Sequence, residues 1–395
     1  MNVHLLEQEI QDFINDNLDS DIVKLALKKN IFEHVTFREI SEQIFGKNKV
    51  KTKLPSWFNA KNIYYPKKIN LEQTSSEITA NYKATLTEGN SVIDLTGGFG
   101  VDCFAFSKKS KAVTHCEISE ELSEIVKHNF KQLGSDNINC ISGDGPEILK
   151  NSDSNFDWIY IDPSRRNDSK GKVFMLRDCL PNIPENIELL FEKSAHILIK
   201  NSPLLDISNG INELKFVKTI HVIGINNEVK ELLFELEKGY EGSIEITTVN
   251  FNKKSTQNFN FELGKTSIAT TGEVNQFLYE PNACILKAGA FSQISEAFNI
   301  DKLHDNSHLY TSENYIENFP GRIFEVIQTI PYNNKRLKKL GISKANITTR
   351  NFPLSVSEIR KKTKIKDGGK DYLFFTTDYQ NNLIVVVCKK PSSLF

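Results

Sequence analysis

The sequence lacks the features that mark membrane, secreted and disulfide-stabilised proteins. No stretch of 18 apolar residues occurs, so no transmembrane span is expected. The first nine residues contain neither the basic region nor the apolar region of a secretory signal. Six cysteines are scattered over 395 residues, and none forms a Cys-x-x-Cys pair. We therefore expect a cytoplasmic protein with reduced, mostly buried thiols and no bound metal.

A large net charge is also missing, since the chain as a whole carries −1. The charge is nevertheless unevenly distributed. From Lys335 to Lys370 there are twelve Lys or Arg residues against two acids, Glu358 and Asp367. Such asymmetry favours a segment that faces nucleic acid, with a solvated basic surface as the ordinary alternative.

Apolar periodicity changes along the chain. Residues 1–75 have helical spacing, and we expect Gly46 and the basic stretch 47–53 to end this pattern and Pro55 to begin an irregular linker. Residues 76–251 alternate short apolar runs with amphipathic helices, which predicts an α/β fold with a doubly wound parallel sheet. In such a fold ligands bind at the carboxyl ends of the strands.

Further strands are expected toward the end of the chain. Residues 232–237 and 243–251 flank a glycine-containing turn, which favours an antiparallel hairpin. A helix is expected near residues 288–298, and residues 372–376 and 383–388 form a second predicted hairpin.

The strongest local motif is an apolar strand that ends in an acid and opens into a glycine-rich loop, Val92-Ile93-Asp94-Leu95-Thr96-Gly97-Gly98-Phe99-Gly100. Glycines allow the backbone to turn sharply and approach a ligand. Two later strands are also followed by acids. Glu117 is placed to hold ribose hydroxyls, and Asp144 to accept from an adenine amino group. Three such acids favour nucleoside binding over simple turns.

Electrostatics selects among nucleoside cofactors. The glycine spacing is not Gly-x-Gly-x-x-Gly, and Asp94 would repel a diphosphate. S-adenosylmethionine carries no phosphate but has an ammonium and a sulfonium, which carboxylates favour. The expected cofactor-binding residues are Asp94, Leu95, Thr96, Gly97, Gly98, Gly100, Asp102, Glu117, Ile118, Asp144, Gly145 and Asp162.

The fourth strand ends in Asp162-Pro163-Ser164-Arg165-Arg166. A carboxylate and a carbonyl here can hold the amino hydrogens of a flipped base and aim its lone pair at a methyl group. An Asp-Pro turn with solvated arginines is the alternative. The expected catalytic residues are Asp162, Pro163, Ser164 and Arg165.

Together these motifs resemble the motif series of class I nucleic-acid methyltransferases. Residues 72–77, with Thr79 and Tyr82, are similar to the segment that closes over the cofactor in those enzymes. The whole chain resembles a bacterial family of methyltransferases with a ferredoxin-like insert and a C-terminal THUMP-like domain. The tracts that carry this wider resemblance are residues 279–283, 309–312, 344–353 and 368–371.

The resemblance implies a Rossmann-like class I methyltransferase sheet, an N-terminal helical region and small α+β domains at the C-terminal end. The implied domains are an N-terminal helical region at 1–75, a methyltransferase domain at 76–251, a ferredoxin-like domain at 252–320 and a THUMP-like basic domain at 321–395.

The chain departs from the wider amino-methylating enzymes in one motif. They have a second proline and an aromatic ring where this chain has Ser164 and Arg165. Stacking by a guanidinium could replace the ring. Methylation of a pyrimidine carbon needs a cysteine nucleophile, for which Cys179 is a poor candidate, so a base nitrogen is favoured.

The basic segment and the THUMP-like resemblance favour structured RNA, a tRNA or an rRNA, bound mainly through phosphates. A catalytically silent RNA-binding protein, a protein or small-molecule methyltransferase, and a dehydrogenase stay open as alternatives. His304 and His308 are four residues apart, but the polar residues between them indicate a loop rather than a metal site. The expected substrate-binding residues are Arg165, Arg166, Lys338, Lys339, Lys344, Arg350, Arg360 and Lys361.

Overall fold

The computed structural model describes residues 1–26, 32–165, 175–253 and 255–391. They form two compact units. The first unit contains Met1–Lys218 and Leu233–Gly242, and the second contains Thr219–Leu232 and the chain from Ser243 onward. Within the described residues, no helix is long and apolar enough to span a membrane.

The first unit begins with short helices, as the periodicity predicted. Ile10, Ile14, Ile40 and Ile44 share one buried cluster. The helices are η1 (Val3–Leu6), α1 (Gln8–Asp16), α2 (Ile22–Ala26), α3 (Phe37–Val50), α4 (Pro55–Asn59), α5 (Lys68–Gln73) and α6 (Glu77–Leu86).

Of the two expected breaks in this region, the first is confirmed and the second is wrong. Helix α3 continues past Gly46 and ends at Val50, within the basic stretch 47–53. A Cβ on Gly46 would lie 2.4 Å from Cβ of Tyr65, so this glycine allows a close helix contact and does not end the helix. Pro55 begins helix α4 instead of a linker, because the first helical position tolerates a residue without an N–H donor.

The predicted doubly wound sheet is confirmed. The strand order in the first unit is β9-β7-β4-β1-β2-β3, and each neighbouring pair among β7, β4, β1, β2 and β3 is parallel. All four residues of β4 are buried, which requires cover on both faces of the sheet. The strands are β1 (Ser91–Asp94), β2 (Ala112–Glu117), β3 (Ile138–Ser142), β4 (Trp158–Ile161), β7 (His196–Asn201) and β9 (Glu228–Glu237), of which β9 belongs to this unit from Leu233.

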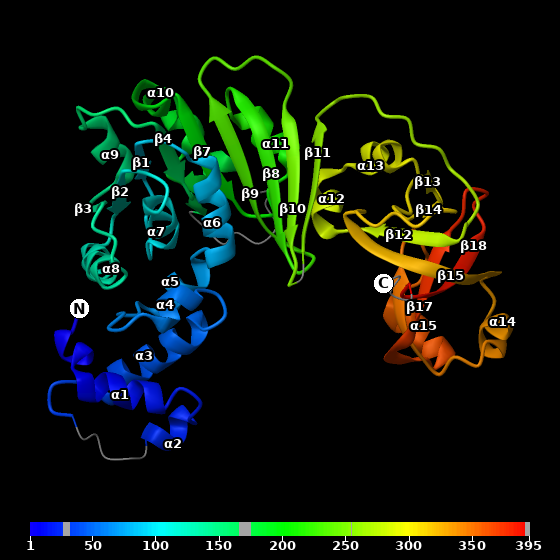
Figure 1. The fold of residues 1–395 in the computed structure, drawn as a ribbon, viewed down its shortest axis with the longest axis horizontal. Coiled ribbons are helices and arrows are strands. Elements are labelled where there is room, and N and C mark those ends of the chain that lie inside the picture. The colour runs from blue at the N-terminus through cyan, green and yellow to red at the C-terminus, as the bar shows by residue number, and fades with distance from the viewer. Residues whose placement is uncertain (27–31, 166–174, 254, 392–395) are drawn as a thin grey trace. The chain divides into compact units, whose positions relative to one another are not determined.

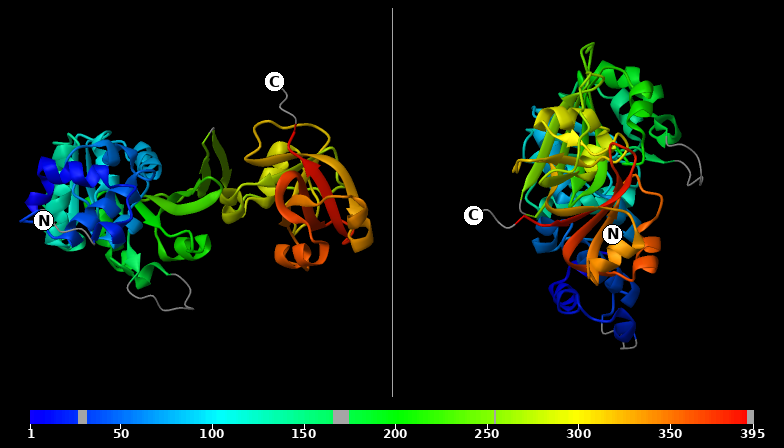
Figure 2. Two further views of the ribbon diagram at one scale, coloured as in Figure 1. Left: turned by 90° about the horizontal axis from the view of Figure 1, so that it is seen from below. Right: turned by 90° about the vertical axis from the view of Figure 1, so that its right-hand side faces the viewer.

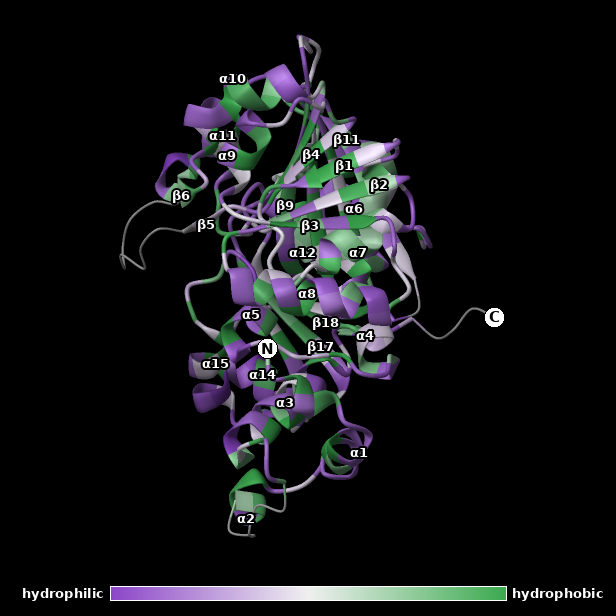
Figure 3. Ribbon diagram, turned by 90° about the vertical axis from the view of Figure 1, so that its left-hand side faces the viewer, coloured by the Kyte–Doolittle hydropathy of each residue, from purple (hydrophilic) through white to green (hydrophobic). Residues whose placement is uncertain are grey.

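Helices connect and cover these strands. Helix α6 packs along α7, and α9 contacts α10 (Figure 1). Figure 3 shows mostly hydrophobic strands beside α8, whose colours alternate as expected for a helix with one buried face. The remaining elements are α7 (Val101–Ser107), α8 (Glu120–Gln132), α9 (Gly145–Lys150), β5 (Ser164–Arg165), η2 (Leu176–Asp178), β6 (Cys179–Leu180), α10 (Ile183–Lys193) and α11 (Ile207–Glu213).

The hairpin expected around residues 239–242 is wrong. In the second unit the order is β11-β10-β8-β9, and β10 pairs in parallel with β8 rather than with β9. The tight turn lies earlier, at Asn226 and Asn227, which both have the positive φ angles of a two-residue hairpin turn. The strands are β8 (Val217–Ile225), β10 (Glu245–Phe251) and β11 (Thr256–Glu262), and β11 was not expected from the sequence.

A seven-stranded sheet makes up the rest of the second unit, in the order β13-β14-β12-β15-β18-β17-β16. The predicted hairpin of β17 and β18 is confirmed. The strands are β12 (Phe277–Pro281), β13 (Asp301–Lys302), β14 (Tyr310–Ser312), β15 (Gly321–Pro331), β16 (Lys344–Thr349), β17 (Lys366–Thr377) and β18 (Leu383–Lys389).

Two helix pairs pack on this sheet. The helix expected near 288–298 is α13 (Phe291–Phe298), preceded by α12 (Ala283–Ala288), and both contribute to a cluster with Phe277 and Tyr279. Helices α14 (Asn334–Lys339) and α15 (Val356–Thr363) pack through Leu337 and Ile359 onto Leu373 and Phe375 of β17. These two orange helices lie on the same side of their strands (Figure 2).

Candidate functional site

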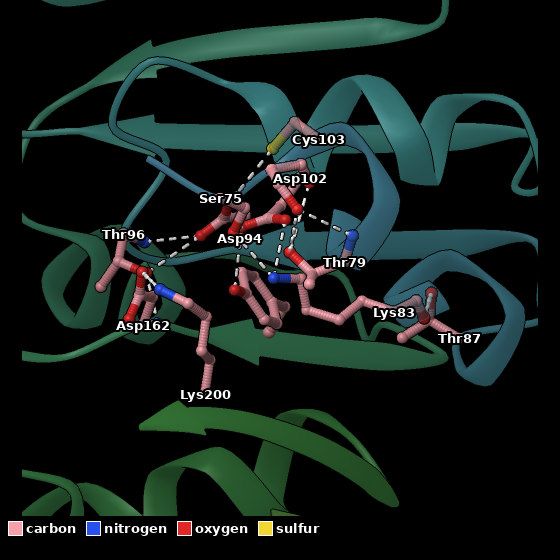
Figure 4. Close-up of polar contacts among 12 residues, drawn as sticks. Ser75, Thr79, Lys83, Thr87, Asp94, Thr96, Asp102, Cys103, Asp162 and Lys200 are labelled. Atoms are coloured by element: carbon pink, nitrogen blue, oxygen red, sulfur yellow. Dashed lines mark hydrogen bonds and ion pairs between the residues drawn. The ribbon is translucent and has the colours of Figure 1, made fainter. Parts of the chain in front are cut away.

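The carboxyl ends of four parallel strands in the first unit bring polar side chains to one edge of the sheet (Figure 4). Asp94 and Glu117 are the last residues of β1 and β2. Asp162 follows β4 directly, and Lys200 is the penultimate residue of β7. The position of each polar side chain is therefore fixed by the carboxyl end of the apolar strand that carries or precedes it.

The glycine-rich loop after β1 is held by contacts that leave no room for side chains. A Cβ on Gly97 would lie 2.3 Å from the His115 ring, and a Cβ on Gly100, which has φ +79°, would lie 2.5 Å from Phe130. Burial lowers the pKa of His115 to about 4, so the ring is neutral at pH 7. The amide of Gly98 donates to Oε2 of Glu117 at 3.0 Å. Glycine at these positions is thus required by packing and by the turn.

Asp94 is almost completely buried, with 1% of its surface exposed. Its Oδ1 accepts from the amide of Thr96 at 2.9 Å and from the Thr96 hydroxyl at 3.1 Å, while Oδ2 accepts from Sγ of Cys103 at 3.3 Å. Burial raises the pKa of Asp94 to about 7, and the nearby Asp102 carboxylate adds to this increase. Asp94 is therefore poised between its neutral and charged forms near physiological pH.

Asp102, in the first turn of the following helix α7, has a different environment. Its Oδ2 accepts from the Ser75 hydroxyl at 2.8 Å and the Tyr160 hydroxyl at 2.9 Å, and Nζ of Lys83 lies 3.0 Å from Oδ1. Burial is the largest influence and alone would raise the pKa of Asp102, but the positive charges of Lys83 and Lys200 and the hydrogen bonds from Lys83 and Ser75 together outweigh it, and the pKa is lowered. Of the two neighbouring carboxylates, Asp102 carries the negative charge.

Lys83 was missed by the sequence reasoning. Its side chain is entirely buried, and its Nζ also donates to the Ser75 hydroxyl at 2.8 Å. A signal was present, since Lys83 falls between the buried Ala80 and Ala84 on the apolar side of α6. A lysine on a buried helix face indicates a buried partner.

Asp162 contacts both the glycine loop and β7. Its amide donates to Oγ1 of Thr96 at 2.7 Å, and its Oδ2 accepts from Nζ of Lys200. Lys200 was also missed, because only the pairing of β4 with β7 shows that it lies beside Asp162. Pro163 is buried and Ser164 is exposed at the start of β5. Arg165 lies in β5 opposite Cys179, while Arg166 is outside the described residues.

The loops after β1 and β3 meet beside β2. A Cβ on Gly145 would lie 2.1 Å from the carbonyl oxygen of Leu95, so the two loops touch through this glycine. Asp144 does not end β3 as expected. The strand stops at Ser142, and Asp144 caps α9 by accepting from the amide of Glu147 at 3.3 Å.

A hydrophobic side chain remains exposed at this edge. Ile118, directly after Glu117, keeps 74% of its surface exposed. Glu117 itself is partly exposed, and its Oε1 accepts from the amide of Ser119 at 2.8 Å. A carboxylate beside an exposed apolar surface is suited to a ligand that has both hydroxyls and a flat ring.

The basic residues predicted to bind substrate in the second unit fall into two groups. Lys338, Lys339, Lys344 and Lys361 are exposed on α14, β16 and α15.

The two arginines among them have structural contacts. Arg360 donates to the carbonyl oxygens of Ile365 at 3.1 Å and Ala345 at 3.2 Å and forms an ion pair with Asp367. Arg350 donates to the buried carboxylate of Glu280 at 3.1 Å. Their guanidinium groups therefore join strands and helices within the unit.

The histidines considered as metal ligands have other contacts. Nε2 of His304 lies 3.1 Å from Oδ1 of Asn381, and the His308 ring stacks on Phe291 with centroids 3.7 Å apart. Among the described residues, no group of three or more His, Cys, Asp or Glu side chains could hold a metal ion.

Family models match three parts of the chain. The model described as conserved hypothetical protein 95 matches residues 70–221. A ferredoxin-like domain matches residues 277–320, and a THUMP domain-like model matches residues 321–390. No curated protein matches the chain significantly.

Solved structures are similar over different lengths. A crystal structure of a candidate methyltransferase from Porphyromonas gingivalis W83 is 31% identical, covers 98% of each chain and has a TM-score of 0.89. An rRNA methylase from Streptococcus thermophilus is 17% identical and covers 41% of this chain and 94% of its own, with a TM-score of 0.30. TrmK of M. capricolum, in complex with S-adenosylhomocysteine, is 18% identical and covers 41% of this chain and 68% of its own, with a TM-score of 0.30.

Proposed function

Because the chain belongs to a family of class I S-adenosylmethionine-dependent methyltransferases with ferredoxin-like and THUMP-like domains, we propose that it methylates a base nitrogen of structured RNA, a tRNA or an rRNA. Its domains are a helical region at 1–75, a methyltransferase domain at 76–251, a ferredoxin-like domain at 252–320 and a THUMP-like basic domain at 321–395.

The edge of the first sheet fits S-adenosylmethionine. The Glu117 carboxylate is suited to the ribose hydroxyls, and the exposed Ile118 to a face of the adenine ring. Asp144 is exposed at the next loop, where it can accept from the adenine amino group. Asp94 and Glu117 end neighbouring strands at this edge, and a cationic ligand beside Asp94 would favour the charged form of its carboxyl group, whose pKa is about 7. The bound cofactor would supply an activated methyl group.

The observation that carries the proposal is the link between the glycine loop and Asp162. Thr96 donates its hydroxyl to Asp94 and accepts the amide of Asp162, so the cofactor loop and the expected acceptor site share one residue. Such coupling fixes the two reacting groups relative to one another, which is the main contribution a protein makes to an in-line transfer.

The second unit supports RNA as the substrate. Its THUMP-like match coincides with the segment in which basic residues outnumber acids, and four of the lysines predicted there are exposed. Exposed lysines bind phosphates by releasing counterions, without regard to sequence. This supports binding to an RNA whose modified nucleotide is selected in the first unit.

Comparison of modified nucleosides tests the proposal. RNA from cells with and without the gene is digested and analysed by mass spectrometry, and we expect one methylated nucleoside to disappear without the gene. The wild-type gene should restore it, and an Asp162→Ala variant should not. Asp153→Ala, an exposed residue of the loop before β4, is the matched control and should restore it. An unchanged nucleoside profile contradicts RNA methylation, and restoration by Asp162→Ala contradicts the catalytic assignment.

A further inference from the structure

Asp162 and Lys200 form a paired acceptor and donor at the edge of the sheet. Strands β4 and β7 run in parallel with Ile161 opposite Ile199, so the next residues along each strand are Asp162 and Lys200. Nζ of Lys200 donates to Oδ2 of Asp162. The Asp162 side chain is 32% exposed and that of Lys200 is 13% exposed, so neither is fully buried.

The pair is held on both sides. The Asp162 backbone is fixed by Thr96, which also contacts the buried Asp94 (Figure 4). Lys200 lies close enough to Asp102 for its positive charge to contribute to the lowered pKa of that carboxyl. The ammonium thus contacts the Asp162 carboxylate and also acts on the charge of Asp102 in helix α7. A ligand beside Asp162 also meets Lys200.

An ammonium beside the acceptor distinguishes two kinds of base nitrogen. An exocyclic amine does not have to lose a proton before it attacks. A cation that donates to the adjoining ring nitrogen withdraws electron density from the amine and so slows its attack. A lactam nitrogen, which carries a hydrogen next to a carbonyl group, must lose that hydrogen before it can attack. Its anion places negative charge on the carbonyl oxygen, where a nearby ammonium stabilises it.

Building on the proposed function, we infer that the acceptor is a lactam nitrogen of RNA, guanine N1 or uracil N3, and that Lys200 selects it by binding the adjacent carbonyl oxygen. Asp162 takes the proton from the nitrogen and passes it to solvent. The freed nitrogen electron pair forms the N–CH3 bond while the S–CH3 bond breaks. The electron pair of that bond stays on sulfur, which leaves as S-adenosylhomocysteine.

The position of the transferred methyl group tests this inference. The purified full chain is incubated with RNA from cells that lack the gene and with S-adenosylmethionine bearing a CD3 group, and the labelled nucleosides are identified by mass spectrometry. We expect 1-methylguanosine or 3-methyluridine. Label on an exocyclic amine, on adenine or on ribose overturns the lactam assignment but retains RNA methylation. Absence of label from RNA contradicts the proposed function, and the lactam assignment with it.

The pH dependence of the rate tests the role of Lys200 separately. With Lys200→Met the single-turnover rate should fall about 10- to 100-fold at pH 7 and recover partly at pH 9, because deprotonation without the ammonium needs a higher pH. Lys200→Arg should stay within about tenfold of the wild type, since it keeps the charge. Lys215→Met, at an exposed ion pair, is the control. An equal loss at every pH in a folded Lys200→Met protein would mean that Lys200 only supports the structure.

Discussion

Nζ of Lys83 lies 3.0 Å from Oδ1 of Asp102, although the lysine side chain is fully buried. This ion pair joins α6 to α7, and through the Tyr160 hydroxyl it reaches β4. A charge in such a place is stable only with its partner, because neither group can be hydrated. The pair therefore connects the segment before β1 to the helix that follows the glycine loop.

Removal of one partner should be costly. We expect Lys83→Met to lower the free energy of unfolding by about 3–5 kcal/mol, because Asp102 is left as an uncompensated buried charge. The double variant Lys83→Met with Asp102→Asn should recover part of this loss. Lys215→Met, which breaks the exposed pair with Glu188, should change stability by at most about 1 kcal/mol. Chemical denaturation measures all three, and a Lys83→Met cost no larger than that of Lys215→Met would contradict the buried pair.

The stability of the fold should depend on the protonation of Asp94. Its pKa is raised by burial to about 7 in the folded chain, above its value in an unfolded chain. The proton therefore stabilises the folded state below about pH 4, and this contribution is lost as the pH rises to about 7. Asp94→Asn should gain stability relative to the wild type across that interval, by a few kcal/mol.

Asp102→Asn should change the pH dependence of stability in the opposite direction to Asp94→Asn. The pKa of Asp102 is lowered in the folded state, so its contribution to stability is present at neutral pH and is lost on acidification. Relative to the wild type, Asp102→Asn should therefore lose stability as the pH rises. Denaturation at several pH values measures both, and parallel curves for Asp94→Asn and the wild type would rule out the raised pKa of Asp94.

Glu117 should contribute to cofactor binding and to the shape of the loop. Glu117→Ala removes a carboxylate that accepts from the amide of Gly98 and is available to ribose hydroxyls. We expect the affinity for S-adenosylmethionine to fall about 100-fold, since hydrogen bonds to charged groups contribute about 1.5–3 kcal/mol each. Glu120→Ala, an exposed residue of the first turn of α8, should bind normally. Titration calorimetry measures both, and equal affinities would remove Glu117 from the site.

The exposed lysines of the second unit should determine the salt dependence of RNA binding. Replacing Lys338, Lys339, Lys344 and Lys361 by alanine should weaken RNA binding and reduce the slope of log affinity against log salt by up to about 3. Changing Lys127 and Lys131, exposed on α8 of the first unit, should leave the slope unchanged.

Arg360→Ala should behave differently from the lysine variants. Its guanidinium holds two backbone carbonyls and Asp367, so we expect a lower melting temperature. Filter binding at several salt concentrations and thermal denaturation separate the two kinds of effect. If the variant without the four exposed lysines kept the wild-type slope of log affinity against log salt, these lysines would be excluded as the RNA contact.

Much of the first sheet was predictable because its strands are short apolar runs between helices. The runs at 92–95 and 158–161 both proved to be strands, the first as far as Asp94, and the alternation of elements predicted the doubly wound parallel sheet. The pairing of β10 was not predictable from local sequence. It depends on a turn at Asn226 and Asn227 that places β9 next to β8, and so leaves the other edge of β8 for β10.

The predictions for the site divide in the same way. Acids at strand ends, such as Asp94 and Glu117, are visible in the sequence because a strand and its following loop are local features. Lys83 and Lys200 were missed because lysine is usually exposed, and the partner that makes each one informative comes from another element. Helix spacing alone could have identified Lys83, whereas Lys200 required the order of the strands.

Cofactor choice is the premise on which the other assignments depend, and titration calorimetry tests it directly. The full chain is titrated with S-adenosylmethionine and, separately, with NAD. Since Asp94 and Glu117 end the strands beside the glycine-rich loop, and the glycines are not spaced for a diphosphate, we expect binding heat with S-adenosylmethionine and none with NAD. Heat with NAD and none with S-adenosylmethionine would contradict it.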